Sequence, residues 1–319
     1  MHGNLFLPEK LYCHFAEHLF GKQMNDRWLE VTVFTRVAES GSFSRTAQEL
    51  GLSQPSTSRI VSGLEARLGV KLLLRTTRSV SLTEAGAAFL KGARQAAADL
   101  EDAEDAARGI DSLRGTIRLA LPIAYGSRAV IPALPGFLER YPELRVEITM
   151  RDERQNLVVA GVDMAIRMGT LEDSMFGARQ LASVPRVLVA SPAYLAKKGV
   201  PTVPEDLAYH DAILHEPNFA EKSTLKLSKG GVERVVTLQG KVKFDAAPGI
   251  LAAAMAGLGI ANVTTVMSSQ ERKDGKLVHL LPDYELEPLK AFAVFPSGPK
   301  PSAKVRALVT HLFAVLGNR

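Results

Sequence analysis

Residues 43–82 read FSRTAQELGLSQPSTSRIVSGLEARLGVKLLLRTTRSVSL, and this stretch decides the fold of the N-terminal region. Ser42, directly before it, is a residue type that caps helices, so a helix is expected to begin there. Gly51 ends this helix, because glycine adopts the left-handed backbone of a tight turn at little cost. Ser53 caps a second helix directly after the turn. The pattern therefore predicts two helices joined by a tight turn, over about residues 43–62.

The second helix is expected to extend from Ser53 to Leu68, with Pro55 in its first turn, where the missing amide costs no hydrogen bond. Apolar residues recur at helical spacing and predict a buried face made of Ile60, Val61, Leu64 and Leu68. The first turns carry hydrogen-bonding side chains instead, and in a recognition helix these positions reach base edges in the major groove. The candidate base contacts are Ser53, Gln54, Ser56, Thr57 and Arg59.

Two flanking segments complete a small domain. An amphipathic helix is expected upstream, from Asp26 to Glu39. A basic hairpin is expected downstream, with strands at residues 70–74 and 79–82 and a polar tip made of Arg75, Thr76, Thr77 and Arg78. Arg75 and Arg78 have no apolar surface to cover at that tip, so we expect them to contact phosphates or the minor groove.

The ordered combination of helix, turn, helix and basic hairpin predicts a DNA-binding domain. Each part alone is also compatible with a small helical domain that carries a solvated hairpin. The formal charge of +5 and the pI of about 9.3 fit a polyanionic partner such as double-stranded DNA, although net charge alone is weak evidence. The candidate DNA contacts outside the two sets above are Ser42, Ser44 and Pro55.

The segment from Glu84 to Ile110 shows a heptad pattern. Its apolar residues are spaced alternately by four and three positions, as in two helices wound around each other, and they are Phe89, Ala93, Ala96, Leu100, Ala103, Ala107 and Ile110. The pattern predicts a dimerisation helix. One long helix lying on its own domain is the alternative, because so short a repeat is ambiguous. Gly109 and Gly115 bracket a hinge.

Beyond the hinge, strands and helices alternate. Strands are expected at 116–121, 146–150 and 164–167, with helices at 127–141 and 155–160. This order predicts a mostly parallel sheet with crossover helices. A second unit begins with a buried strand at 187–191 and continues with segments at 213–215, 241–244, 247–257, 260–264 and 277–281. A strand at 291–296 and a helix at 302–316 close the chain. Two such lobes place a ligand between them, at strand ends where helix amides are free.

The chain resembles the LysR-type transcriptional regulators. The N-terminal match is long and specific, and it comprises AESGSFSRTAQELGLSQPSTSR (38–59), LEARLGVKLL (64–73), LTEAG (82–86) and the Arg-Thr-Thr-Arg wing typical of one subgroup (75–78). The runs that match the family's effector domain are PGFLERYPELRVEI (135–148), VDMAIRMG (162–169), VLVASPAYL (187–195), PEDLAYHD (204–211) and AAAMAGLGIA (252–261). The resemblance covers about residues 24–316.

This resemblance implies an α+β protein with a winged helix-turn-helix, a long linker helix and a two-lobed α/β effector domain like the periplasmic solute-binding proteins of type 2. The implied parts are the DNA-binding domain at 24–83, the linker and hinge at 84–114, and the effector domain at 115–319, with lobe I at 116–184 and 289–319 and lobe II at 185–288. Residues 1–23 fit no part of this plan. They are expected to be a loose tail, or to result from a start codon placed too early, since Met24 is where the family usually begins.

The resemblance also places a small-molecule effector between the lobes. The matching positions are Ala124, Tyr125, Ser127, Arg167, Met168, Ser183, Asp245, Ala246, Val263 and Thr264. The chain departs from the family pattern at residues 122–125, where many relatives have serine or threonine, and at residues 262–263, where relatives often have leucine-proline.

These departures leave the class of ligand open. Ser127 either holds a carboxylate or caps its own helix. Arg167 either binds an anion or pairs with an acid such as Asp163. We expect a small carboxylate or another small polar metabolite.

Composition limits the other classes of protein. A chain of 319 residues with 46% hydrophobic residues is expected to fill two or three domains. No apolar stretch approaches the roughly 18 residues of a membrane-spanning helix, so a soluble protein is expected. The only cysteine, Cys13, excludes an internal disulfide framework and suits the reducing cytoplasm. The first residues lack the continuous apolar core of a signal peptide.

No catalytic constellation is evident. The chain lacks HExxH, GxSxG, P-loop and GxGxxG motifs, and Cys13, His14 and His18 have no fourth ligand nearby. We therefore expect no enzyme, metal or cofactor. A solute-binding protein and an architectural DNA-binding protein are the rival classes, but the first needs a signal peptide and the second leaves the two-lobed domain without a role. The sequence predicts an effector-controlled regulator of transcription, a homodimer or homotetramer that contacts RNA polymerase if it is an activator.

Overall fold

The computed structural model describes residues 27–75, 80–108, 113–153, 157, 161–171, 177–215, 222–296, 298 and 300–317. The chain divides into two compact units, residues 1–97 with 156–161, and residues 98–155 with 162–319. Several predicted features lie outside the described residues, namely the extension at 1–23, the hairpin tip with Thr76, Thr77 and Arg78, the seam residue Ile110 and most of the helix at 155–160.

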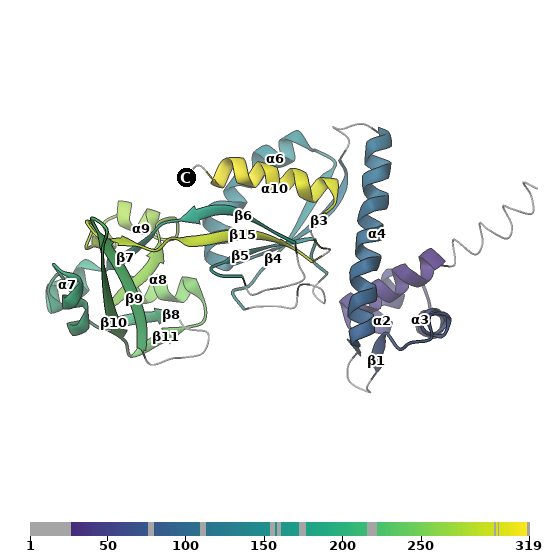
Figure 1. The fold of residues 1–319 in the computed structure, drawn as a ribbon, viewed down its shortest axis with the longest axis horizontal. Helices are drawn as coiled ribbons and strands as arrows, with labels where there is room; N and C mark the ends of the chain where they lie inside the picture. The colour runs from purple at the N-terminus through teal and green to yellow at the C-terminus, as the bar shows by residue number, and fades with distance from the viewer. Residues whose placement is uncertain are drawn as a thin grey trace, which may run out of the picture. The chain divides into compact units, whose positions relative to one another are not determined.

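The first unit contains helices and one hairpin (Figure 1). A helix over 27–40 is followed by α2 (Phe43–Glu49), α3 (Gln54–Leu68), β1 (Leu73–Arg75), β2 (Val80–Leu82) and α4 (Glu84–Arg108), of which residues 98–108 belong to the second unit. The strands pair antiparallel. The predicted caps are confirmed, since Ser42 accepts a hydrogen bond from the amide of Arg45 and Ser53 accepts one from the amide of Ser56. Gly51 has the expected positive φ of 65°.

The core of this unit joins all its helices. Phe34, Leu64, Leu72 and Leu90 are fully buried, and the rings of Phe34 and Phe89 meet edge to face with centroids 5.3 Å apart. The prediction that Leu68 is buried was wrong, because 37% of this residue is exposed. It is the last residue of α3, beside the left-handed Gly69, and there the helix face no longer meets the core.

Lobe I of the second unit is built on a five-stranded sheet. Its order is β4 (Leu144–Met150), β3 (Gly115–Leu121), β5 (Met164–Met168), β15 (Leu289–Phe295) and β6 (Gly177–Val184). Helices α6 (Leu134–Arg140) and α10 (Ala303–Leu316) pack on one face of this sheet, where Ile117, Phe137, Met164 and Leu308 are buried (Figure 1).

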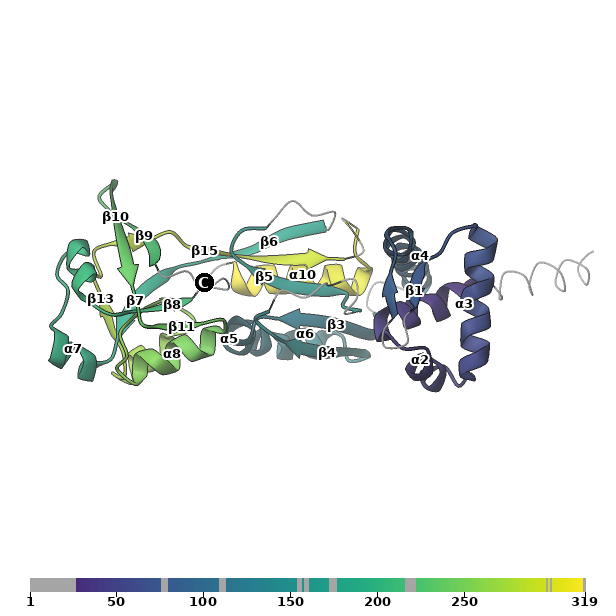
Figure 2. The same ribbon diagram turned by 90° about the horizontal axis from the view of Figure 1, so that it is seen from below.

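Lobe II has three layers. Its central sheet has the order β11 (Val242–Phe244), β8 (Ala212–His215), β12 (Ile260–Thr264), β7 (Arg186–Ala190) and β13 (Val278–Leu280). One face carries α8 (Ala247–Met255), and the other carries a smaller sheet of β10 (Val232–Gln239), β9 (Lys222–Lys229) and β14 (Glu285–Leu286) (Figure 2). The remaining helices are α7 (Pro192–Lys198), α9 (Ser269–Lys273) and the 3₁₀ segment η3 (Pro204–Tyr209).

The three strands from which a mostly parallel sheet was predicted, β3, β4 and β5, do run parallel, but each complete sheet is mixed. In lobe I, β3 runs parallel to β4 and β5, but β15 runs antiparallel to β5 and β6. In lobe II, β8 runs parallel to β11 and β12, but β7 runs antiparallel to β12 and β13. The chain passes between the lobes at Pro185 and again at residues 287–288, and the strands beside these crossings, β6, β7 and β15, make the antiparallel pairs.

The helix predicted to begin at Ser127 begins earlier. Helical residues start at Ile123 and continue through α5 (Ile123–Tyr125), a π-helical turn η1 (Gly126–Val130), a 3₁₀ turn η2 (Ile131–Ala133) and α6. Gly126 lies inside this run. An added Cβ there would lie 2.8 Å from the Cβ of Leu121, so the glycine allows close packing.

Within the ranges given above, no helix is long and apolar enough to cross a membrane. The same residues include no group of three or more histidine, cysteine, aspartate or glutamate side chains that could hold a metal ion.

Candidate DNA-binding surface and effector region

The start of α3 presents a row of hydrogen-bonding side chains. Ser53, Gln54 and Arg59 are exposed, and Ser56 is half-buried. The Ser56 hydroxyl oxygen accepts hydrogen bonds from the Ser53 hydroxyl at 2.8 Å and from Nη2 of Arg59 at 3.3 Å. These local bonds align the side chains and are weak enough to be exchanged for bonds to bases.

The other candidate DNA contacts differ in exposure. Thr57 does not lie on this surface, because it is fully buried and its hydroxyl donates to the carbonyl oxygen of Ser53 at 3.1 Å. The side chain of Ser42 caps α2 and is half-buried. Ser44 and Pro55 are exposed. Because its buried hydroxyl bonds within the first turn of α3, Thr57 is not a base contact.

Arg75 joins the hairpin to both helices. Its guanidinium lies 4.5 Å from the ring centroid of Phe43 in α2. Its Nη1 donates to Ser58 Oγ at 2.8 Å and its Nη2 donates to Ser62 Oγ at 3.3 Å, both in α3. The interpretation that Arg75 has no apolar surface to cover was therefore wrong. The pairing of aromatic ring and arginine across the fold was not visible in the local sequence.

Arg75→Ala is expected to lower the free energy of unfolding of the first unit by about 1–2 kcal/mol, because the variant lacks the cation–π interaction and two hydrogen bonds. Urea unfolding followed by the fluorescence of Trp28, the only tryptophan of the chain and a residue of the first helix, measures this. Arg45→Ala, at an exposed arginine of α2, is the matched control. Equal unfolding midpoints for the two variants would contradict the structural role of Arg75.

Glu65 anchors the start of the hairpin from inside α3. Only 2% of its side chain is exposed. Its carboxylate accepts hydrogen bonds from the amides of Leu72 and Leu73 at 2.9 and 3.1 Å and from Nζ of Lys71 at 2.9 Å. Burial by itself raises the pKa of Glu65, but the bonds from Lys71, Leu73 and Leu72 outweigh it, so the pKa lies below its ordinary value. No role was predicted for Glu65 from the sequence, although an acid directly after the buried Leu64 was a signal.

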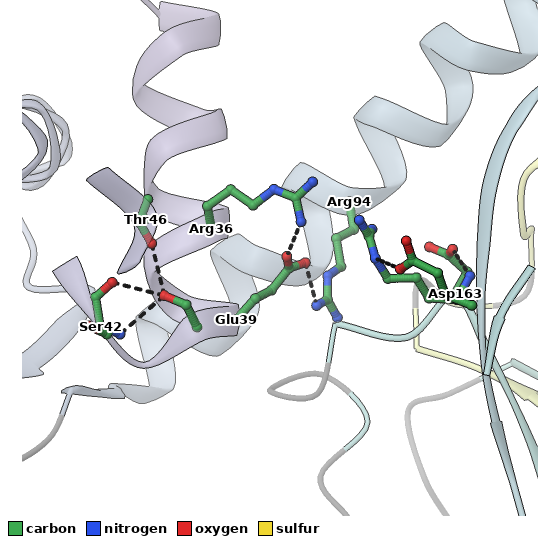
Figure 3. A network of polar contacts seen from close by, with 9 residues as sticks. Arg36, Glu39, Ser42, Thr46, Arg94 and Asp163 are labelled. Carbon is green, nitrogen blue, oxygen red and sulfur yellow. Dashed lines mark hydrogen bonds and ion pairs between the residues drawn. The ribbon is translucent and has the colours of Figure 1, made fainter. Parts of the chain in front are cut away.

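Ion pairs hold the helices of the first unit together. Arg67 of α3 pairs with Glu30 of the first helix at 2.7 Å. Glu39 of the first helix pairs with Arg36 at 3.2 Å and with Arg94 of α4 at 2.8 Å (Figure 3). In the same region the hydroxyls of Ser40 and Thr46 lie 2.8 Å apart. These ion pairs thus connect the first helix to α3 and to α4.

The predicted dimer seam of α4 divides into two parts. Phe89 packs against the core of the first unit and Ala93 is buried, so this half of the seam lies on its own domain. Leu100 is 47% exposed, and Ala96, Ala103 and Ala107 are also exposed. In the second unit, Asp102 of α4 pairs with Nη1 of Arg306 in α10 at 2.7 Å.

The predicted effector residues differ in exposure and packing. Tyr125 is buried in the core of lobe I and Val263 in that of lobe II. Met168 packs against the lobe I core, whereas Ser183 and Asp245 are exposed. Ala246 is the N-cap residue of α8, Arg167 lies on β5 opposite Phe292, and Thr264 Oγ1 accepts from the amide of Met267.

Ser127 does not cap a helix start. Its hydroxyl donates to the carbonyl oxygen of Ile123 at 2.6 Å, one turn earlier, and its side chain is otherwise exposed. The cap was expected because the helix was predicted to begin at this residue. Asp163, the expected alternative partner of Arg167, accepts a hydrogen bond from the amide of Arg118 at 2.7 Å.

Two contacts between the lobes involve residues that were not predicted from the sequence. The carboxylate of Asp152 accepts hydrogen bonds from the amides of Ile123 and Ala247, at 2.8 and 3.0 Å. Arg128 of lobe I pairs with Glu271 of lobe II at 2.6 Å. The only signal for Asp152 was an acid that follows a strand by two residues. The amide after Ala246, which was expected to be free, is therefore bonded to Asp152.

Comparisons with known proteins agree with this architecture. Residues 28–87 match the model of the bacterial regulatory helix-turn-helix protein, lysR family, and residues 111–317 match the LysR substrate binding domain. The transcriptional regulator CrgA of Neisseria meningitidis is 33% identical over 91% of this chain and 97% of its own length. The transcriptional activator AaeR of Escherichia coli is 31% identical over 90% of this chain and 93% of its own.

A solved structure is also similar. The full-length Vibrio cholerae virulence activator AphB, a member of the LTTR protein family, aligns with a TM-score of 0.54 and 27% identity over 89% of this chain and 98% of its own. The relatives are regulators of transcription and not enzymes. With both family models matched and relatives above 30% identity over most of its length, this chain belongs to the LysR family of transcriptional regulators, with a helix-turn-helix DNA-binding domain and an effector-binding domain.

Proposed function

We propose that the regulator reads its operator with the exposed start of α3. The observation that supports this most is the row of Gln54, Ser56 and Arg59, which presents donors and acceptors on a helix whose opposite face is buried. Side chains of these types distinguish base pairs in the major groove. Arg78, at the hairpin tip, is proposed to contact a phosphate or the minor groove.

The test is selection of operators from random DNA with the full-length protein, followed by footprinting of the selected sites. A two-fold symmetric sequence preference, protected in successive major grooves, is the expected result for a regulator that binds as a dimer. Recovery of unselected sequences at physiological salt would overturn sequence-specific recognition, because only the phosphate contribution would remain.

The proposed homodimer or homotetramer uses the exposed half of the α4 seam. Leu100→Asp places a charge in an apolar layer and is expected to weaken association by on the order of 3 kcal/mol, more than a hundredfold. Sedimentation velocity measures the shift toward monomers. Ala106→Asp adds the same charge at an exposed α4 position outside the seam and should leave the assembly intact. An unchanged oligomer in Leu100→Asp would place the contact elsewhere.

The proposed effector is a small carboxylate or another small polar metabolite bound between the two lobes in the cytoplasm. Support comes from the positive charge of Arg167, which lies on β5 of lobe I. The effector is proposed to change how the oligomer sits on DNA and, in an activator, how RNA polymerase is engaged. Operator affinity of the full chain, measured with a panel of carboxylic acids and matched neutral compounds, tests this. A response to neutral apolar compounds alone would overturn the proposed class of ligand.

A further inference from the structure

One side of α3 carries a polar stripe that bonds to the hairpin. Ser58, Ser62 and Glu65 lie four and three positions apart, a spacing that places side chains along one line of a helix. Glu65 accepts from the amide of the first residue of β1 and from the amide before it. Ser58 and Ser62 accept from the guanidinium of Arg75, the last residue of β1, at 2.8 and 3.3 Å. The stripe thus fastens both ends of β1 to α3.

The guanidinium of Arg75 is held from several directions. Its two Nη atoms donate to serines that lie one helical turn apart on α3, and Nη2 also lies 3.9 Å from Oε2 of Glu65. On another side the group stacks over the ring of Phe43 in α2. Because a guanidinium is a planar fork of donors, contacts of this kind fix its direction as well as its position. The outer end of β1 is therefore tied to α2 and α3 at once.

The hairpin is too small to set its own direction. β1 and β2 pair over three residues each, and a two-stranded hairpin by itself is marginally stable in water. At the outer end Val80 packs partly against the core of the unit, whereas Leu74 is 55% exposed. The contacts of Arg75 with α2 and α3 therefore contribute much of what sets the angle between this end of the hairpin and α3.

We propose that Ser58 and Ser62 are positioning residues of operator recognition, which act on DNA through Arg75. They hold the hairpin at one angle to α3, so that contacts of the hairpin with the DNA backbone or the minor groove form together with contacts of α3 with bases. The guanidinium of Arg75 is thereby assigned to the protein and not to a phosphate. The recognition half of this proposal rests on the proposed function of α3, whereas the fastening of the hairpin is measurable without DNA.

The stripe contributes to affinity by holding the hairpin ready for binding. A protein whose hairpin has the binding orientation for only a fraction of the time binds with an affinity reduced by that fraction. Two hydrogen bonds from a charged donor hold the orientation, so their loss is expected to weaken operator binding by on the order of tenfold. The loss falls on the DNA beside the hairpin, whereas the base pairs under α3 keep their preference.

Hydrogen–deuterium exchange of the free full-length protein tests the fastening. The double variant Ser58→Ala/Ser62→Ala removes both acceptors, and Arg75→Lys keeps the positive charge but not the fork of donors. Both are expected to speed exchange several-fold at residues 73–82, while exchange in α3 stays as in wild type. Thr57→Val removes a buried hydroxyl of α3 away from the stripe and is the matched control, with hairpin exchange like that of wild type.

Footprinting on a selected operator tests the consequence for DNA. At saturating protein, the double-serine variant and Arg75→Lys should lose protection of the backbone beside the hairpin but keep protection of the bases under α3. Thr57→Val affects stability alone, so it should give the complete wild-type footprint once the operator is saturated. The affinity losses of the serine and arginine changes should not add in the triple variant, because both remove the same contact.

Each half of the proposal has its own contrary result. Unchanged hairpin exchange in the double-serine variant and in Arg75→Lys would overturn the fastening. Faster exchange with a complete footprint, or affinity losses that add, would overturn the positioning role. Wild-type affinity and footprint in Arg75→Lys would assign this residue to a simple charge contact with a phosphate instead. If the double-serine variant fails to fold, Ser62→Ala, at an exposed position, takes its place. If no operator is selected, base reading by α3 fails and the positioning role fails with it, while the exchange comparison still decides the fastening.

Discussion

Replacing Glu65 with alanine is expected to lower the free energy of unfolding of the DNA-binding unit by about 3–5 kcal/mol. The change removes a buried carboxylate that accepts from two backbone amides and from Lys71. The amides of Leu72 and Leu73 are then left without their acceptor, and each unsatisfied buried donor costs about 1–3 kcal/mol. Urea unfolding of the full-length protein, followed by Trp28 fluorescence, reports on this unit because Trp28 lies in its first helix.

Two variants control this measurement. Glu65→Gln keeps one carbonyl oxygen for the amides and should lose less stability than alanine. Glu49→Ala removes an exposed glutamate from the end of α2 and should have little effect. If Glu65→Ala and Glu49→Ala unfold at the same urea concentration, the hairpin is not anchored by this carboxylate.

Acid should weaken the same anchor. The pKa of Glu65 is lowered in the folded protein, so the stabilisation it supplies is complete above the pKa of an unfolded glutamate and is lost as pH falls through the folded value. The difference in stability between wild type and Glu65→Gln should therefore be constant near neutrality and shrink at acidic pH. A difference that stays constant down to the acid unfolding of the unit would show that the carboxylate charge is not involved.

Alanine at Gln54, Ser56 or Arg59 is expected to reduce the discrimination between the preferred base and its competitors. The expected loss is about 1–3 kcal/mol for each well-formed side chain–base contact that the substitution removes. The reason is that these side chains stand on the accessible start of α3, while the other face of the helix is buried. Competition binding with operators that differ at single base pairs measures this reduction position by position.

Thr57→Val is the matched control for this series. It removes a hydroxyl from the same helix turn, but the hydroxyl is buried and bonded to the carbonyl oxygen of Ser53. Its base preference should equal that of wild type, with an effect on stability alone. A variant series in which Thr57→Val relaxes base preference and the three alanine variants do not would reject the assigned surface.

Interactions between near neighbours were readable from the sequence. The caps Ser42 and Ser53, the left-handed Gly51 and the extent of α3 depend on contacts within about four residues, so they follow from local chemistry. The exposed start of α3 is predictable for the same reason, because helical spacing separates its buried and polar faces. The β9–β10 hairpin was also predictable but was not predicted, although buried and exposed residues alternate along the strands on both sides of Gly230-Gly231.

Contacts between distant residues were decided by the tertiary structure alone. No local pattern places Arg75 over Phe43, since the stacking depends on how the hairpin returns to α2. Likewise, β15 enters the sheet of lobe I between β5 and β6 only after the chain has completed lobe II. Asp152 reaches Ile123 and Ala247, residues 29 and 95 positions away, because both helix starts end at the same boundary. The sequence determined that residue 152 is a carboxylate and therefore a hydrogen-bond acceptor. The packing of the two lobes determined which donors lie within its reach.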